Sequence, residues 1–168
     1  MKLITSISDS ADDQLLDAVF RVSVRGIILN KNGDMALMHV KNQGYYKLPG
    51  GGLESEESLI EAISREILEE TGCKIDEVFI LGYVHEVRSR VKLIQTSYCF
   101  TGVVSGEIKK TNFTKAEQTD GFELLWVSPA KALELINNSK SNYQEIDFVI
   151  RRDTSIIAEA MNGLINSL

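Results

Sequence analysis

Carboxylates crowd one short stretch of this chain. Residues 51–73 contain seven glutamates but only one basic residue, Arg65. Negative charge at this density is unfavourable unless something cationic neutralises it. Glu66, Glu69 and Glu70 are spaced three and four residues apart, so on a helix their side chains would share one face. Three carboxylates on one face suit a hard cation that prefers oxygen ligands, and we therefore expect Mg²⁺ or Mn²⁺ here.

The signals around these carboxylates predict the helix that would carry them. Ser58 and Glu61 have the spacing of a capping box, which places Ser58 at the N-cap. Gly72 suits the left-handed position just after a helix end, so we expect a helix over residues 58–71. Its buried side is expected to be an apolar stripe made of Leu59, Ile60, Ile63 and Ile67. The plainer alternative is a solvated, glutamate-rich surface helix.

A glycine triplet precedes this helix. Residues 50–52 let the backbone turn tightly and approach a ligand or metal, and Pro49 fixes the entry into the loop. Arg65 lies four residues from both Glu61 and Glu69, so it can pair with either and hold a carboxylate in place. The loop and the single arginine favour a built site over a plain charged surface.

Residues 51–73 resemble the Nudix box at every fixed position of that pattern. The matching residues are Gly51, Glu57, Arg65, Glu66, Ile67, Glu69, Glu70 and Gly72. Cys73 stands where a bulky aliphatic residue is usual, which is a mild departure because a buried thiol behaves as a small hydrophobe. The flanking segments 45–49 and 123–127 also resemble the family.

The resemblance implies hydrolysis of a nucleoside diphosphate linked to another group. Carried over by position, Glu66, Glu69 and Glu70 would be metal ligands, and Gly51 would add a backbone carbonyl. The general base would be Glu66 or a loop glutamate, while Arg65 would orient Glu66 or its neighbours. Glu57 would act through a metal-bound water or hold the loop together. Its alternative is a first-turn glutamate that the helix dipole favours.

One more acid from a later loop would complete the site, because members of the family often recruit one. Glu117 is our choice, since it lies in the polar segment before the last expected strand. Asp120 and Glu123 are the alternates, and each of the three could equally be an exposed loop acid.

Candidates for substrate binding are basic and aromatic residues near the expected strand ends. Arg88 and Arg90 could meet phosphates, as could Lys47 beside the glycine loop. Tyr46 or its neighbour Tyr45 could stack on a base, although strand alternation would send one of them into the core. Further residues that could face the site or simply pack or be solvated are Arg21, Arg25, His85 and Trp126.

The pattern of the whole chain predicts an α/β protein. Strands are expected over 20–29 and 35–40 as a hairpin, and over 45–48, 74–87, 91–104 and 122–127. We expect a loop over 109–121, a helix over 128–137 with Ser128 at its N-cap, and a second helix over 141–162 that Asp153 and Thr154 could break. The Nudix resemblance implies an α/β/α sandwich with a mixed sheet.

Length and composition fit a single domain over residues 1–168. Residues 1–17 are expected as an N-terminal extension and 141–168 as a C-terminal helix. Residues 1–19 or the last helix could serve a homodimer interface. The net charge of −6 argues against a stable nucleic-acid partner, which would require a basic face. No membrane anchor or signal peptide is expected, and two cysteines, Cys73 and Cys99, are typical of reduced thiols in a cytoplasmic protein.

Subfamily signatures outside the Nudix box narrow the choice of substrate class. The proline typical of ADP-ribose hydrolases, the tyrosine typical of dinucleoside polyphosphate hydrolases and the coenzyme A signature are not at their expected places. We therefore expect a MutT-like nucleoside triphosphate pyrophosphohydrolase, with damaged or non-standard nucleotides among its candidate substrates. The alternatives are an ADP-ribose or nucleotide-sugar pyrophosphatase, a non-catalytic nucleotide-sensing module, and an isomerase or glycosidase on the same fold.

Overall fold

The computed structural model describes residues 1–10, 16–106 and 109–165. Its sheet is mixed, and the strands run in the order β1-β5-β6-β2-β3-β4, with β7 also pairing with β3. The strands are β1 (Leu3–Ser8), β2 (Val19–Leu29), β3 (Met35–Val40), β4 (Tyr45–Lys47), β5 (Lys74–Arg88), β6 (Leu93–Ser105) and β7 (Phe122–Val127). The helices are α1 (Leu59–Thr71), α2 (Lys115–Asp120), α3 (Pro129–Asn137) and α4 (Ile146–Ile165).

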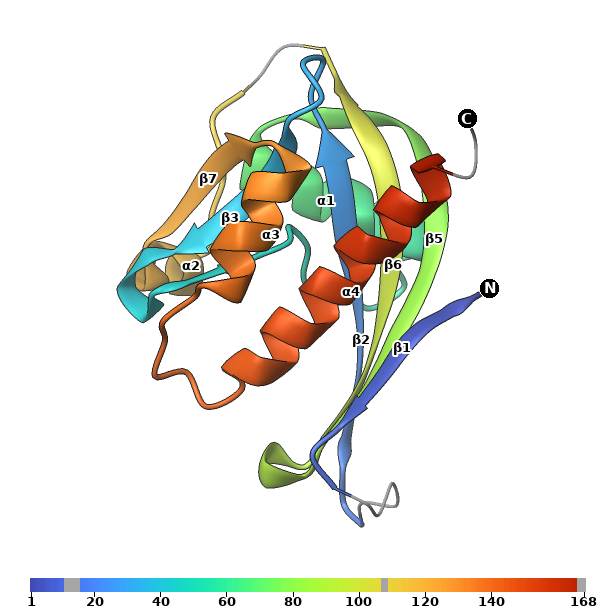
Figure 1. The fold of residues 1–168 in the computed structure, drawn as a ribbon, viewed down its shortest axis with the longest axis vertical. Helices are drawn as coiled ribbons and strands as arrows, with labels where there is room; N and C mark the ends of the chain where they lie inside the picture. The colour runs from blue at the N-terminus through green and yellow to red at the C-terminus, as the bar shows by residue number, and fades with distance from the viewer. Residues whose placement is uncertain (11–15, 107–108, 166–168) are drawn as a thin grey trace.

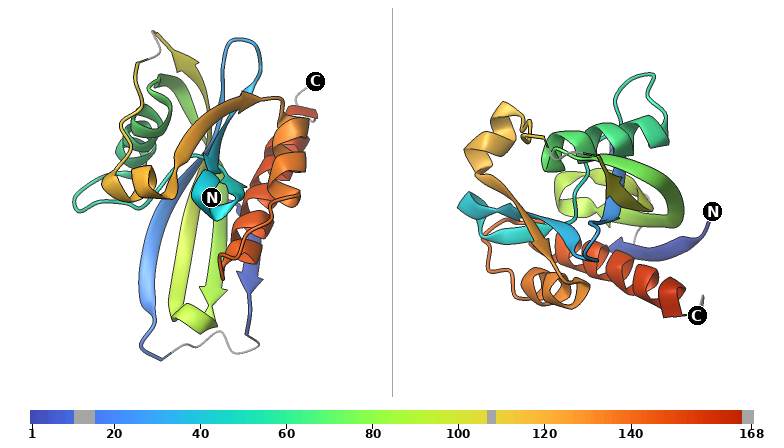
Figure 2. Two further views of the ribbon diagram at one scale, coloured as in Figure 1. Left: turned by 90° about the vertical axis from the view of Figure 1, so that its left-hand side faces the viewer. Right: turned by 90° about the horizontal axis from the view of Figure 1, so that it is seen from above.

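Helices cover both faces of the sheet, as Figures 1 and 2 show. The helix α1 packs on one face over a core that includes Val24, Ile63 and Phe100. On the other face α3 and α4 pack over a separate core, whose buried members include Ile136 and Ile156. The expected α/β/α sandwich with a mixed sheet is therefore confirmed.

The β2–β3 connection is a hairpin only at its turn. The two strands pair through Leu29 and Met35 alone, after which they diverge. Along its whole length β2 pairs in parallel with β6, while β3 pairs antiparallel with β7. The glycine loop takes the edge of β2 that β3 leaves, because the amide of Val24 donates to the Gly51 carbonyl at 2.9 Å and Gly26 donates to Pro49 at 3.0 Å. This pairing ties the loop to the sheet.

Two expectations about the later elements were wrong. Residues 115–120, expected in a loop, form the helix α2, because Thr114 and Glu117 make a full capping box. The last helix begins at Ile146 rather than at residue 141, and it continues unbroken past Asp153 and Thr154.

The expected N-terminal extension contains an edge strand. Residues Leu3–Ser8 form β1, which pairs in parallel with β5. Its Ile7 is buried in the same core as α4. Among the described residues, no helix is both long enough and apolar enough to cross a bilayer.

Candidate active site

The helix α1 has the ends that the sequence predicts. The Ser58 hydroxyl accepts a hydrogen bond from the Glu61 amide at 3.3 Å, and the Glu61 carboxylate accepts one from the Ser58 amide at 2.8 Å. Gly72 takes the left-handed conformation with φ 70°, and a Cβ there would collide with the Lys109 carbonyl. The predicted apolar stripe of the helix is wrong only at Ile60. This side chain is 49% exposed because it lies off the packed face.

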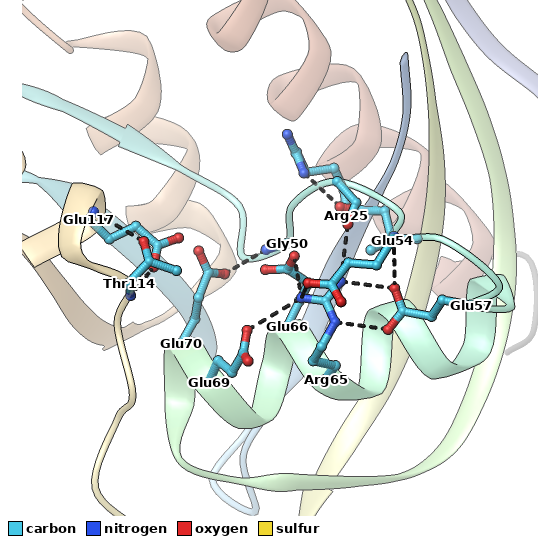
Figure 3. Close-up of polar contacts among 12 residues, drawn as sticks. Arg25, Gly50, Glu54, Glu57, Arg65, Glu66, Glu69, Glu70, Thr114 and Glu117 are labelled. Carbon is cyan, nitrogen blue, oxygen red and sulfur yellow. Dashed lines mark hydrogen bonds and ion pairs between the residues drawn. The ribbon is translucent and has the colours of Figure 1, made fainter.

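Arg65 is the centre of the carboxylate cluster on α1 (Figure 3). Its guanidinium holds Glu57 through two bonds, Nε to Oε1 at 2.8 Å and Nη2 to Oε2 at 2.9 Å. Nη2 also donates to the Gly52 carbonyl at 3.0 Å, and Nη1 lies 2.9 Å from Glu66 and 3.3 Å from Glu69. One side chain therefore joins the glycine loop to two carboxylates on the acidic face.

The expected pairing of Arg65 with Glu61 or Glu69 is confirmed for Glu69. The Glu61 carboxylate is used by the N-terminal cap instead. Glu57 bonds to Arg65 and accepts the Glu54 amide at 3.1 Å, so it holds the loop together. Arg65 lowers the pKa of the Glu57 carboxyl through their hydrogen bonds.

Glu70 is the most deeply placed of the three aligned carboxylates. It is buried, and its Oε2 accepts the Gly50 amide at 2.6 Å. The Lys47 ammonium lies 3.2 Å from Glu70 Oε1 and 3.3 Å from the Gly50 carbonyl. Burial raises the pKa of Glu70, and Lys47 opposes that shift. Burial also raises the pKa of Glu69, and Arg65 opposes it.

The donor set fits a hard divalent cation. Among the described residues no three acidic, histidine or cysteine side chains converge on one point, and Lys47 and Arg65 are bonded to the carboxylates there. The Lys47 ammonium occupies a position that a metal cation could take, since it already touches a carboxylate and a backbone carbonyl. A Cβ at Gly51 would collide with the Glu66 carboxylate, so only glycine lets that carboxylate lie against the loop.

Of the three loop acids, Glu117 lies at the site. It lines the same pocket as Glu66, and its charge helps to raise the pKa of Glu69. Its Oε2 accepts the Thr114 amide at 2.8 Å, so α2 positions it. Asp120 is bonded to Gln43, and Glu123 is paired with Lys41 and His39 at the surface.

A pocket of about 280 Å³ opens beside the carboxylates, between β2, the glycine loop and the start of α4. Lys47 and Arg88 line it, as the sequence suggests. Tyr45 lines it rather than Tyr46, because neighbouring residues on β4 face opposite ways, and Tyr46 stacks on His39 with ring centroids 4.4 Å apart.

Arg90 lies elsewhere, and other residues take its place in the pocket. It follows β5 in a short 3₁₀ turn and lines a different hollow with Asp9 and Arg151. The pocket residues that sequence reasoning missed as site residues are Gln95, Phe122, Tyr143, Val149 and Arg152. A signal for Arg152 exists, because it and Asp153 stand in the apolar register of α4, three and four residues after the buried Val149.

The sequence model of the NUDIX domain family matches residues 19–147 of this chain. A putative 8-oxo-dGTP diphosphatase of Bacillus subtilis (strain 168) is 29% identical over 140 residues, covering 79% of this chain and 87% of that protein. A MutT-like protein of Streptomyces ambofaciens is 27% identical over 114 residues, covering 67% of each.

Solved structures agree on the fold. A NUDIX hydrolase from Nitrosomonas europaea superposes with a TM-score of 0.65 at 22% identity, covering 85% of this chain and 89% of that one. A MutT protein from Methanosarcina mazei Go1 gives a TM-score of 0.52 at 27% identity, covering 83% and 96%. Fold, box and family match together show that the chain belongs to the NUDIX domain family and is a Nudix hydrolase.

Proposed function

We propose that this chain is a metal-dependent pyrophosphohydrolase of nucleoside triphosphates. The observation that carries the proposal is the acidic face of α1 against the glycine loop. There Glu66, Glu69 and Glu70 share one face. Among the described residues the only cations in contact with them are Arg65, which is bonded to Glu66 and Glu69, and Lys47, which is bonded to Glu70.

The site has an excess of negative charge that a metal cation could neutralise. Five carboxylates (Glu54, Glu57, Glu66, Glu69 and Glu70) are paired with Arg65 and Lys47. Five negative against two positive charges leave a formal excess of three negative charges. A polyanionic substrate would be repelled by that excess, so a divalent cation has to accompany it.

Glu66, Glu69, Glu70 and Glu117 would hold Mg²⁺ or Mn²⁺, together with the carbonyl of Gly51. That carbonyl accepts the Val24 amide and keeps a second lone pair for a ligand. When bound, such a cation neutralises charge on phosphate oxygens and lowers the pKa of a coordinated water.

The chain's own residues have distinct tasks in this proposal. Glu66 or Glu117, both at the pocket, would accept the proton of the attacking water. Arg65 is a positioning residue, because it holds Glu66 and Glu69 at fixed places. Glu57 positions Arg65 through its two bonds. Lys47 would move from Glu70 to a phosphate oxygen as substrate and cation enter.

The names of the relatives support the triphosphate as substrate. One relative is named a putative 8-oxo-dGTP diphosphatase and another a MutT-like protein. Shorter matches, over 62 residues, are to proteins named RNA pyrophosphohydrolase. The names of the diphosphatase and the pyrophosphohydrolase share cleavage within a phosphate chain, which is the reaction that we assign to this site.

A substrate panel tests the proposal. It holds nucleoside triphosphates, oxidised guanine nucleotides, ADP-ribose, nucleotide sugars and dinucleoside polyphosphates, each with Mg²⁺ or Mn²⁺ and with EDTA as the control. We expect metal-dependent release of pyrophosphate and a nucleoside monophosphate from triphosphates. Cleavage of ADP-ribose or nucleotide sugars instead would replace this substrate, and binding without any cleavage would point to a nucleotide sensor.

A further inference from the structure

Four arginines line this pocket. Arg21 and Arg25 come from β2, Arg88 from the end of β5 and Arg152 from α4. Arg21 is exposed, whereas the other three are each at least nine-tenths buried. Buried guanidinium groups are costly unless each one is paired and hydrogen-bonded.

Two carboxylates form ion pairs with these arginines, and both also accept hydrogen bonds from other groups. Glu86 lies 2.7 Å from Arg88 and 3.9 Å from Arg152, and it also accepts Gln95 at 2.8 Å. Asp153 bonds to Arg152 at 2.7 Å and accepts the Leu48 amide at 2.8 Å. Four positive charges against two negative ones leave a formal excess of two positive charges.

Of the four arginines, Arg25 most clearly lacks hydrogen-bond and ion-pair partners. It is 6% exposed, and its Nη1 donates to the Val24 carbonyl at 2.6 Å. Its Nε has no hydrogen-bond partner, and no carboxylate of the described residues lies within ion-pair distance of the guanidinium. Burial and the neighbouring Arg152 lower the pKa of Arg25 to about 10. The Nε of Arg88 is likewise buried without a partner.

The chemistry of these free donors points to an anion. A guanidinium presents two parallel N–H groups, which match two oxygens of one phosphate. A neutral base would satisfy some of the hydrogen bonds but would leave the excess charge uncompensated. The pocket tyrosines also offer limited stacking surface, because Tyr45 and Tyr143 stack on each other with centroids 5.6 Å apart.

We propose that this arginine pocket binds a phosphate of the substrate beyond the diphosphate held at α1, namely the outermost phosphate of a nucleoside triphosphate. The inference rests on the proposed function and deepens it. Glu66 and Gly51 line the same pocket as the arginines, so one phosphate chain can run from the acidic face to Arg25. The nucleobase then lies outside the arginine pocket.

Binding of simple phosphates tests the proposal without any turnover. Calorimetry with Mg²⁺ would compare inorganic tripolyphosphate, inorganic pyrophosphate and a nucleoside monophosphate. The variants are Arg25→Gln and, as the matched control, Arg151→Gln, an exposed arginine on α4. We expect Arg25→Gln to reduce the preference for tripolyphosphate over pyrophosphate by about 10-fold or more, and Arg151→Gln to leave it unchanged. Binding of the monophosphate should stay the same in both variants.

Two results would overturn the proposal. One is an unchanged preference for tripolyphosphate over pyrophosphate in Arg25→Gln. The other is a loss of monophosphate binding as large as the loss of tripolyphosphate binding, which would show that the pocket binds the nucleoside. Thermal unfolding checks that the variant is folded. If Arg25→Gln does not fold, Arg25→Lys carries the same test, because it keeps the charge and loses the paired donors.

The failure of this inference is distinguishable from failure of the proposed function. A chain that cleaves triphosphates but shows no role for Arg25 refutes only the arginine pocket. A chain that binds tripolyphosphate through Arg25 but cleaves no triphosphate refutes only the proposed reaction.

Discussion

Replacing Arg65 with glutamine should destabilise the protein measurably in the absence of metal. Arg65 contacts Glu57, Glu66 and Glu69 and the Gly52 carbonyl, all within 3.3 Å. Without its charge these carboxylates repel one another with no cation between them. Removal of one partner from a buried ion pair costs about 3–5 kcal/mol.

The magnitude has to be reduced for solvent screening, because the Arg65 side chain is 24% exposed. We expect a loss of about 2–3 kcal/mol in the free energy of unfolding. For a chain of this size that corresponds to a fall in Tm of about 4–12 °C. Urea and thermal unfolding in EDTA measure both quantities.

A matched control separates this site from ordinary surface charge. Lys131 pairs with Glu134 at 2.7 Å on α3, and both side chains are about half exposed. Lys131→Gln should cost less than about 1 kcal/mol. A loss in Arg65→Gln no larger than that of the control would refute the reasoning that Arg65 holds the cluster together.

The pH dependence gives a second check on the same variant. The pKa of Glu57 is lowered in the folded protein, chiefly by its hydrogen bonds to Arg65, from an ordinary value of 4.5. The stability from this pair is therefore present above that ordinary value and is lost as the pH falls through the folded value. The stability difference between parent and Arg65→Gln should shrink as the pH falls below about 4.5.

Three further results are expected. Glu69→Gln should keep or raise the free energy of unfolding at neutral pH in EDTA, because the raised pKa of Glu69 means that its ionised form is unfavourable in the folded protein. Urea unfolding at falling pH should show this gain disappearing as Glu69 of the parent protein becomes protonated. A hundredfold excess of Mg²⁺ over its Kd should stabilise the parent by about 2.7 kcal/mol, which thermal unfolding would show as a rise in Tm of about 5–11 °C, and a smaller rise is expected in Glu69→Gln. Thr114→Ala should cost about 1 kcal/mol through loss of the α2 cap. Steady-state assays should show reduced turnover, because Glu117 loses the hydrogen bond from the Thr114 hydroxyl and keeps only the one from the amide; unchanged turnover would contradict a role for this hydroxyl in positioning Glu117.

The carboxylate helix could be predicted from the sequence because its signals are local. The cap at Ser58, the end at Gly72 and the spacing of the three carboxylates all lie within fifteen residues, and all were confirmed. The same kind of signal was overlooked at Thr114 and Glu117. The polar segment around them lacks an apolar stripe, so only the capping box marks α2.

The arginine pocket could not be predicted in the same way, because distant segments build it. Arg25 and Arg152 belong to β2 and α4, which lie far apart in the sequence and are brought together only by the fold. Whether Tyr45 or Tyr46 faces the pocket depends on the side of β4 that packs against α4, and three residues of strand are too few to show that in the sequence. The start of α4 was misplaced for a related reason, since Ser141 donates to the Gln43 carbonyl instead of beginning the helix.

The most direct test of the central claim is turnover of a nucleoside triphosphate as a function of Mg²⁺ concentration in the parent, Glu70→Gln and Glu134→Gln. Glutamine at position 70 can still accept the Gly50 amide, so the loop keeps its anchor while the charge is lost. We predict that turnover falls by orders of magnitude in Glu70→Gln and stays at the parental level in Glu134→Gln, a surface position on α3. Equal turnover of Glu70→Gln and the parent at limiting Mg²⁺ would contradict the assignment of the acidic face as the metal site.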